Sequence, residues 1–269
     1  GSTRVGKIVM EAAAKQLTPV TLELGGISPC IVSEHAQLKL AAKRIVWGKF
    51  LNAGQTCVAP DYLLVAERVK EELLMHIEKY ITVFFGSEPL NNEEYGKIIN
   101  HLHFDRLTSL MTDGQVRIGG TSDRETVKIA PTVIEQVDWV SPIMQEEIFG
   151  PLLPVITFDN FSEVSALLKP KPKPLAAYLF TENKAEEHDF LQYVSFGGGC
   201  INDVVVHMAS SHVPFGGVGD SGMGNYHGVA SFQNFSHRKV ILKKSTKLDV
   251  PVRYPPYKNH LKLLKKILH

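Results

Sequence analysis

Cysteine is scarce in this chain: its 269 residues include only Cys30, Cys57 and Cys200. Three scattered cysteines exclude a small disulfide-bonded scaffold and do not have the spacing of a structural zinc site. They are typical of a protein in a reducing compartment, and we expect a cytoplasmic one. His101 and His103 have no third ligand nearby in the sequence, so no metal site is predicted.

An excess of one charge and long apolar stretches are missing as well. The 29 basic and 28 acidic residues leave a formal net charge of +1, which gives no indication of nucleic acid as a partner. No run of roughly 18 apolar residues occurs, so no integral membrane segment is predicted, and no signal peptide is recognisable. The hydrophobic content of 44% is ordinary for a globular protein.

Helical and strand periodicities alternate along the chain, which predicts an α/β fold with a mostly parallel sheet flanked by helices. Helices are predicted at residues 2–16, 38–51, 69–85, 92–111, 161–168 and 185–194. Strands are predicted at residues 20–24, 28–32, 62–66, 116–118, 128–133, 152–158, 175–181, 197–202 and 238–244. In the first helix, Val5, Ile8 and Val9 share one side, and we expect that side to be buried.

The end of the chain combines apolar and basic residues at helical spacing. Leu261, Leu264, Ile267 and Leu268 fall on one side of a predicted helix, with lysines around them. A solvated or subunit-packing tail accounts for this pattern, and a weak contact with a membrane surface is the alternative.

Two chemically reactive groups each lie beside flexible backbone. Cys57 stands in the stretch Gly-Gln-Thr-Cys-Val-Ala-Pro at residues 54–60, and Glu23 opens Glu-Leu-Gly-Gly at residues 23–26. A thiolate attacks carbonyl carbon, and a carboxylate moves protons or activates water. The pair is therefore a candidate site for covalent acyl transfer. A non-catalytic alternative explains the same two features: Cys57 is then a structural cysteine, and Glu23 forms an ion pair at the edge of a cleft.

Four further motifs favour the catalytic interpretation. They are Gly-Ser-Thr-Arg-Val-Gly at 1–6, Glu-Glu-Ile-Phe-Gly-Pro at 146–151, Gly-Gly-Cys-Ile-Asn at 198–202 and Pro-Phe-Gly-Gly-Val-Gly-Asp-Ser-Gly at 214–222. In this order the motifs resemble the aldehyde dehydrogenase superfamily. Met-Gly-Asn-Tyr-His-Gly at 223–228 and Phe-Ser-His at 235–237 look most like its class 3 branch of fatty and aromatic aldehyde enzymes. The resemblance runs from Gly1 to about Pro256.

The resemblance implies oxidation of an aldehyde to a carboxylic acid with NAD or NADP as cofactor. Cys57 matches the family's nucleophile, which forms a thiohemiacetal and then a thioester, and Glu23 matches the general base. The sequence does not choose between the two cofactors. At Ile27 the chain departs from the family pattern, since most relatives have lysine there.

The resemblance also implies binding residues. Gly1 and Ser2, at the start of the first helix, match contacts to the pyrophosphate of the cofactor. Glu147 matches the residue that binds the nicotinamide ribose hydroxyls, and Phe149 the one beside the nicotinamide.

Two more residues match positions close to the aldehyde. They are Asn202 and Phe215, which we predict as substrate-binding residues. An asparagine that bonds a turn at the end of a strand is the alternative for Asn202.

Against the family pattern, the chain lacks most of the N-terminal half. We therefore expect a remnant of the NAD(P)-binding domain at 1–27, a catalytic domain at 28–234, and an oligomerisation strand and tail at 235–269 that form a homodimer. Two alternatives stay open. The first is an acylating enzyme that passes its thioester to coenzyme A, but such relatives commonly lack the general base that Glu23 matches. The second is a catalytically silent folding or subunit-interface module.

Overall fold

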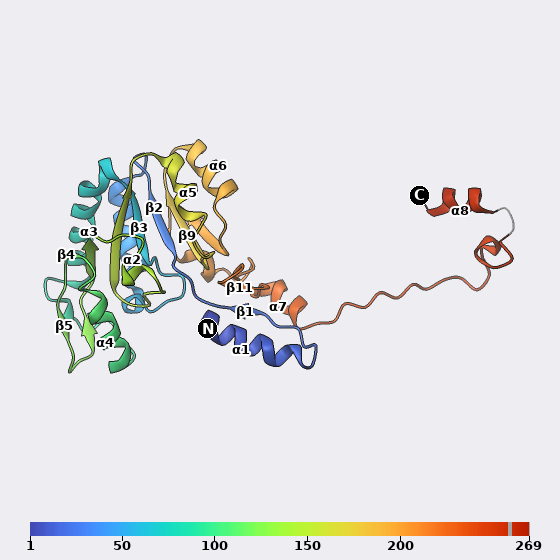
Figure 1. Cartoon of the computed structure of the whole chain (residues 1–269), viewed down its shortest axis with the longest axis horizontal. Helices are drawn as coiled ribbons and strands as arrows, with labels where there is room; N and C mark the ends of the chain where they lie inside the picture. The colour runs from blue at the N-terminus through green and yellow to red at the C-terminus, as the bar shows by residue number, and fades with distance from the viewer. Residues whose placement is uncertain (258–259, 269) are drawn as a thin grey trace. The chain divides into compact units, whose positions relative to one another are not determined.

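The computed structural model describes residues 1–257 and 260–268 (Figure 1). The chain divides into two units, Gly1–Phe235 and Ser236–His269. Each unit is considered by itself.

A mostly parallel seven-stranded sheet forms the centre of the first unit. Its strand order is β10 (Gly198–Ile201), β9 (Ala176–Phe180), β2 (Pro29–Val32), β3 (Tyr62–Ala66), β8 (Leu152–Phe158), β7 (Thr132–Glu135) and β4 (Gln115–Ile118). Only the pair β4–β7 is antiparallel. All residues of β2, β3 and β9 are buried, as expected for parallel strands covered on both faces. The predicted fold class is confirmed.

Helices cover both faces of this sheet. Helices α2 (Leu38–Phe50) and α3 (Lys70–Phe85) pack with the side chains of Cys30, Val32, Leu63 and Val65 on one face. Helices α4 (His101–Leu110), α5 (Val164–Leu168) and α6 (Lys184–Tyr193) pack with Ile31 and Leu64 on the other face. Successive strand residues point to opposite faces, so the two hydrophobic clusters follow directly from the strand sequences.

The shorter elements of the first unit surround the main sheet. Helix α1 (Thr3–Ala14) opens the chain, and α7 (Gly228–Asn234) closes the unit. Strand β1 (Leu22–Glu23) pairs with β11 (Gly222–Met223), and β5 (Ser122–Asp123) pairs with β6 (Lys128–Ile129). The buried residue of α1 is Gly6, which packs on Leu24. The predicted apolar side is not buried, since Val5, Ile8 and Val9 are exposed.

One predicted helix begins later than expected, and one predicted strand is divided. The helix expected at 92–111 begins only at His101, because Asn100 caps it by accepting a hydrogen bond from the His103 N–H at 2.9 Å. The strand expected at 128–133 is divided between β6 and β7 at Pro131, which has no N–H to donate to a ladder.

The second unit contains a 3-10 turn at Pro251–Arg253 and helix α8 (Leu261–Leu268). The strand predicted at 238–244 does not form within the single chain, where Val240, Ile241 and Leu242 are highly exposed. A strand requires a hydrogen-bonded neighbour, and the described residues of this chain provide none there. The predicted apolar side of α8 includes Ile267 and Leu268, whose side chains lie outside the described residues. Within the described ranges, no helix is long and apolar enough to cross a membrane.

Candidate active site

Six of the eight predicted site residues line one cavity of about 500 Å³. Four of them come from segments that precede three neighbouring parallel strands: Glu23 lies before β2, Cys57 before β3, and Glu147 and Phe149 before β8. The lining is completed by Gly1, Ser2, Gly25, Gln55 and Thr56. Although Glu23 is the last residue of its own strand β1, the cavity lies at the amino edge of the main sheet.

The Cys57 loop is held in an unusual backbone conformation. Asn52, Ala53 and Gly54 have φ values of 52°, 54° and 74°, in the left-handed region that L-residues with side chains seldom adopt. A Cβ on Gly54 would lie 2.2 Å from the Gly150 carbonyl oxygen, so only glycine fits there. The turn after α2 thereby brings Cys57 next to the loop that carries Glu147.

Gln55 fastens the same loop to the residues before α4. Its side-chain amide donates to the Lys97 carbonyl at 2.8 Å and accepts from the Ile99 N–H at 2.9 Å. Gln55 stands in the motif around Cys57, but it was not among the predicted site residues.

The environment of Cys57 favours the neutral thiol. Burial raises its pKa to about 12, and the negative charge and hydrogen bond of Glu23 act in the same direction. Burial also raises the pKa of Cys30, which is fully buried, and that of Cys200. Because Glu23 lines the same cavity as Cys57, it is a candidate to take the thiol proton.

The Glu23 carboxylate is directed by the short ladder between β1 and β11. Glu23 pairs with Gly222, whose φ is 141°, and a Cβ there would lie 2.0 Å from the Leu22 carbonyl oxygen. The Oε1 atom of Glu23 is buried and has no hydrogen-bond partner among the described residues. An unpaired carboxylate oxygen is suited to receive a proton.

The other side of the cavity is suited to a nicotinamide nucleotide. Ser2 caps α1, its Oγ accepting from the Val5 N–H at 3.4 Å, and helix N-termini attract phosphate. Glu147 packs so tightly on Gly25 that a Cβ there would lie 1.9 Å from Glu147 Oε2. The Oε1 atom of Glu147 is buried without a partner among the described residues, which leaves an acceptor for a ribose hydroxyl. Phe149 exposes 38% of its surface at this cavity.

Glu147 ionises with difficulty in this position. Burial raises its pKa to about 8, and the charges of Asp61 and Glu23 add to the rise. A larger cavity of about 590 Å³ shares Ser2, Gly25, Glu147 and Phe149 with the first. The two cavities together offer room for an extended ligand along this edge of the sheet.

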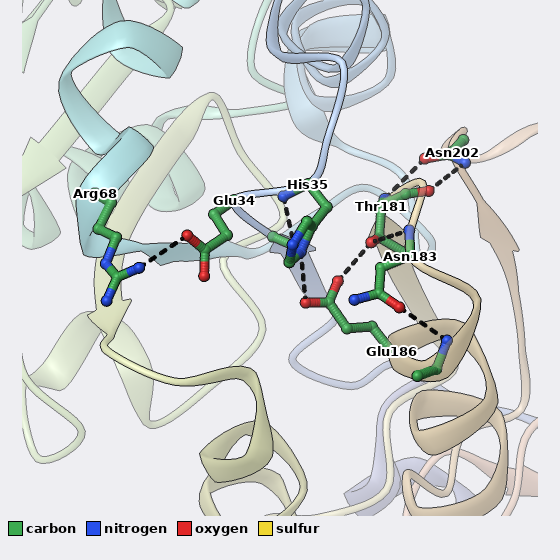
Figure 2. Close-up of polar contacts among 9 residues, drawn as sticks. Glu34, His35, Arg68, Thr181, Asn183, Glu186 and Asn202 are labelled. Carbon is green, nitrogen blue, oxygen red and sulfur yellow. Dashed lines mark hydrogen bonds and ion pairs between the residues drawn. The ribbon is translucent and has the colours of Figure 1, made fainter.

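Asn202 is not brought to the cavity. Its side-chain amide accepts from the Thr181 N–H at 2.9 Å and donates to the Thr181 carbonyl at 2.8 Å (Figure 2). Thr181 in turn bonds Glu186, which accepts from His35 at 2.9 Å. These contacts join the carboxyl ends of β2, β9 and β10, whereas the cavity lies at the amino edge. The geometry corresponds to the structural alternative for Asn202, and we withdraw its assignment to substrate binding.

Phe215 does not line the cavity. It is buried in an aromatic group with ring centroids at 6.0 Å from His207, 5.7 Å from Tyr226 and 5.5 Å from His227. The hydrophobic cluster that contains Phe215 also packs against Cys57. A role for Phe215 in binding the aldehyde therefore stays a prediction. Such a role acts through this cluster and not through direct contact with the cavity.

Tyr226, which was not among the predicted site residues, packs its ring edge-to-face on Phe215 with the centroids 5.7 Å apart. Burial and the charge of Glu23 raise the pKa of its hydroxyl. Its position in the motif at 223–228 was the available signal. In the part of the chain that the structure describes, no cluster of three potential metal ligands occurs.

Comparison with known proteins identifies the family. The model of the aldehyde dehydrogenase family matches residues 1–241, and the chain therefore belongs to this family. It is 49% identical over 98% of its length to the 4,4'-diaponeurosporen-aldehyde dehydrogenase of Staphylococcus aureus. It is 47% identical to the mouse "aldehyde dehydrogenase, dimeric NADP-preferring" over 95% of its length, and 47% identical to family 3 member H1 of Arabidopsis thaliana. The predicted resemblance to class 3 enzymes is confirmed.

Solved structures agree with this assignment. A substrate-bound Staphylococcus aureus AldH structure matches all of this chain with a TM-score of 0.97 at 48% identity. An NAD-dependent aldehyde dehydrogenase from Sinorhizobium meliloti matches 88% of the chain with a TM-score of 0.80 at 32% identity. The chain spans 57–58% of the length of the three named relatives and 59% of the AldH chain.

Proposed function

We propose that this chain carries the catalytic thiol and base of an NAD(P)-dependent aldehyde dehydrogenase, which oxidises an aldehyde to a carboxylic acid. The observation that supports it is a single cavity lined by Cys57, Glu23, Glu147 and Phe149. A nucleophile, a base and the residues suited to a nicotinamide nucleotide thus share one space.

The reaction begins at Cys57. Glu23 accepts the thiol proton as the sulfur bonds to the aldehyde carbon, which gives the alkoxide form of a thiohemiacetal. The raised pKa of Cys57 makes this proton transfer necessary at neutral pH. The Cys57 backbone N–H is a candidate donor to the oxygen that becomes negative in this step.

Two further steps complete the oxidation. When bound, the nicotinamide supplies the acceptor for the hydride that leaves the thiohemiacetal carbon, and a thioester on Cys57 remains. Glu23 then releases the thiol proton to solvent and takes a second proton from water. The water oxygen attacks the thioester carbon, the carbon–sulfur bond breaks, and the sulfur takes this second proton as the carboxylic acid leaves. Hydrolysis by water distinguishes this proposal from transfer to coenzyme A, for which no base at Glu23 is needed.

Gly1, Ser2, Glu147 and Phe149 are the proposed cofactor residues, and the cofactor is NAD or NADP. The names of the relatives include both preferences, NADP in mouse and NAD in Sinorhizobium meliloti. Resemblance to class 3 enzymes favours apolar medium-chain, long-chain or aromatic aldehydes.

A homodimer is the proposed assembly, since the mouse relative is named dimeric. Residues 235–269 are its proposed contribution, because Val240, Ile241 and Leu242 are exposed and lack a strand partner within the described chain. We keep the proposed division into a cofactor-domain remnant at 1–27 and a catalytic domain at 28–234.

Replacement of Cys57 by alanine in the full-length protein tests the function. Cys57→Ala is expected to abolish aldehyde-dependent reduction of NAD or NADP, while Cys30→Ala and Cys200→Ala retain most of it. Cys30 and Cys200 serve as matched controls because neither lines the cavity. Turnover that survives in Cys57→Ala contradicts the proposal. If no aldehyde is oxidised by the parent protein, a silent folding or interface module becomes the better interpretation.

A further inference from the structure

Ile148 separates Glu147 from Phe149, and both of its backbone polar groups are bound by side chains from other parts of the fold. Its N–H donates to Asp61 Oδ1 at 2.9 Å, and its carbonyl accepts from Arg106 Nη2 at 2.5 Å. Ile148 lies outside the helices and strands, so no ladder or helical bond holds it. The two peptide groups that flank Ile148 are therefore fixed by Asp61 and Arg106.

Arg106 fastens this loop to helix α4. It lies within α4, and besides the Ile148 carbonyl it binds Glu146, its Nη1 donating to Glu146 Oε1 at 2.9 Å. The guanidinium group thus spans the loop from Glu146 to Ile148, with one nitrogen for each contact. Arg106, Glu146, Glu147 and Phe149 line the same cavity of about 590 Å³. The arginine is part of the wall of the proposed cofactor site.

Asp61 fastens the other side of the same residue. It is buried, and its second carboxylate oxygen accepts from the Ser28 N–H at 2.8 Å. Asp61 holds the peptide between Glu147 and Ile148, whereas Arg106 holds the peptide between Ile148 and Phe149. The two side chains therefore control different neighbours of Ile148, and Arg106 is the one that acts on Phe149.

Phe149 has a backbone conformation that depends on such support. Its φ is 48°, in the left-handed region, which is unfavourable for an aromatic residue and persists only where the surroundings hold it. This torsion follows directly after the peptide whose carbonyl oxygen Arg106 binds. The Phe149 side chain is part of the lining of both cavities. The direction of the ring is thus linked to the contact between Arg106 and Ile148.

We propose that Arg106 is a positioning residue for hydride transfer, which holds the Ile148–Phe149 peptide so that the Phe149 ring stays beside the nicotinamide. This inference rests on the proposed function, because the nicotinamide belongs to its cofactor. Without the arginine, φ of Phe149 can relax toward the negative values that residues with side chains prefer, and the ring turns away. The other proposed cofactor contacts, Gly1, Ser2 and Glu147, remain. Hydride transfer should therefore suffer more than cofactor affinity.

Rapid mixing with the full-length enzyme measures the two effects separately. Arg106→Met keeps an apolar chain and removes both donated hydrogen bonds. The burst rate of reduced cofactor is expected to fall by roughly 10- to 100-fold, since displacement by about 1 Å costs roughly 10²-fold. Dissociation constants for NADH and NADPH, measured by fluorescence, should rise only about 2- to 10-fold, as for loss of one aromatic contact. An unchanged burst rate, or an equal loss of rate and affinity, overturns the proposal.

Two control variants separate the peptide contact from ion pairing. Arg124 donates to Asp105 of the same helix at 2.9 and 3.0 Å, so Arg124→Met removes a similar pair away from the loop and should leave both measurements unchanged. Glu146→Gln removes the charge but leaves the bond to the Ile148 carbonyl. It should lower the burst rate by less than about threefold, because exposed ion pairs contribute little. A loss in either control as large as in Arg106→Met overturns the proposal.

A double variant tests whether Arg106 acts through Phe149. In the Phe149→Leu background, Arg106→Met is expected to change the burst rate by less than about twofold, because the ring that the arginine positions is already absent. Losses of burst rate that multiply in the double variant show that Arg106 acts by another route, and they overturn the proposal.

Folding of each variant is checked by circular dichroism. If Arg106→Met does not fold, Arg106→Lys replaces it, since a single ammonium does not reproduce the two-pronged contact, and the same split between rate and affinity is expected. If neither folds, Arg106 serves folding, and the proposal is overturned. A parent enzyme that neither binds nor reduces NAD or NADP contradicts both this inference and the proposed function. Normal hydride transfer by the parent and by Arg106→Met contradicts this inference alone.

Discussion

The hydroxyl of Tyr178 donates a 2.6 Å hydrogen bond to the carbonyl oxygen of Val58, the residue that follows Cys57. Both residues are fully buried, and they are separated by 120 positions in the sequence. Tyr178 lies in β9, where it is also opposite Cys30 in β2 and Cys200 in β10. The contact ties the Cys57 loop to the centre of the sheet.

Tyr178→Phe is expected to lower the free energy of unfolding by about 1–3 kcal/mol, because it leaves the buried Val58 carbonyl without its donor. It should also reduce kcat, since the Cys57 loop loses an anchor. Tyr95→Phe is the matched control, as Tyr95 donates a similar bond of 2.8 Å to the Ile129 carbonyl. Urea unfolding and steady-state assays measure both effects. An equal loss of kcat in the two variants contradicts a specific role for Tyr178.

Glu23→Gln is expected to slow hydrolysis of the thioester more than formation of the reduced cofactor. The change removes a base but preserves size, and loss of a general base typically costs about 10²- to 10⁴-fold. Rapid mixing should then reveal a burst of reduced cofactor followed by a slow steady state. If burst and steady state slow equally, Glu23 has a different role.

Alkylation of Cys57 should become faster as pH rises. Its pKa is raised to about 12, so at pH 7 the neutral thiol predominates. The reactive thiolate fraction increases about tenfold for each pH unit below that pKa. Iodoacetamide labelling, followed by mass spectrometry of the Cys57 peptide, measures the rate.

The Glu23→Gln variant tests the direction in which the charge of Glu23 shifts the pKa of the Cys57 thiol. The charge of Glu23 raises the thiol pKa, so its removal should lower that pKa and speed labelling at pH 8. Labelling that is unchanged, or slower, in Glu23→Gln argues against close contact of the two groups.

The 269-residue chain by itself is expected to show no measurable dehydrogenase activity but to retain slow ester hydrolysis. A nicotinamide must be held accurately against the substrate carbon, since displacement by about 1 Å costs roughly 10²-fold. In this chain only Gly1, Ser2, Glu147 and Phe149 are proposed to hold the cofactor. Ester cleavage requires the thiol and the base, and both line the cavity.

Hydrolysis of an activated ester, with Cys57→Ala as control, measures the remaining activity. Strong reduction of NAD by the isolated chain contradicts the expectation. Ester hydrolysis that Cys57→Ala leaves unchanged shows that the thiol and base do not act together in this chain.

The sequence by itself determined the fold class and marked two candidate reactive groups. Apolar runs such as Tyr62–Ala66 and Ala176–Phe180 have the length of strands. They lack the alternation of apolar and polar residues that a sheet with one solvent-exposed face requires, so they predict strands that are buried on both faces. The break of small residues around Cys57 and the glycines after Glu23 marked the two reactive groups. These features are local, because backbone geometry limits which residues a tight turn accepts.

The tertiary structure decided which side chains meet. Asn202 follows its strand as predicted, but its amide is used by Thr181, and Phe215 is enclosed by other aromatic rings. In the sequence Lys49 is one lysine of a predicted helix, and only the packing shows that its side chain is fully buried. Hydrogen bonds and charge interactions form between residues that are far apart in the sequence. They depend on how separate loops are placed relative to one another, and no single stretch of sequence contains that information.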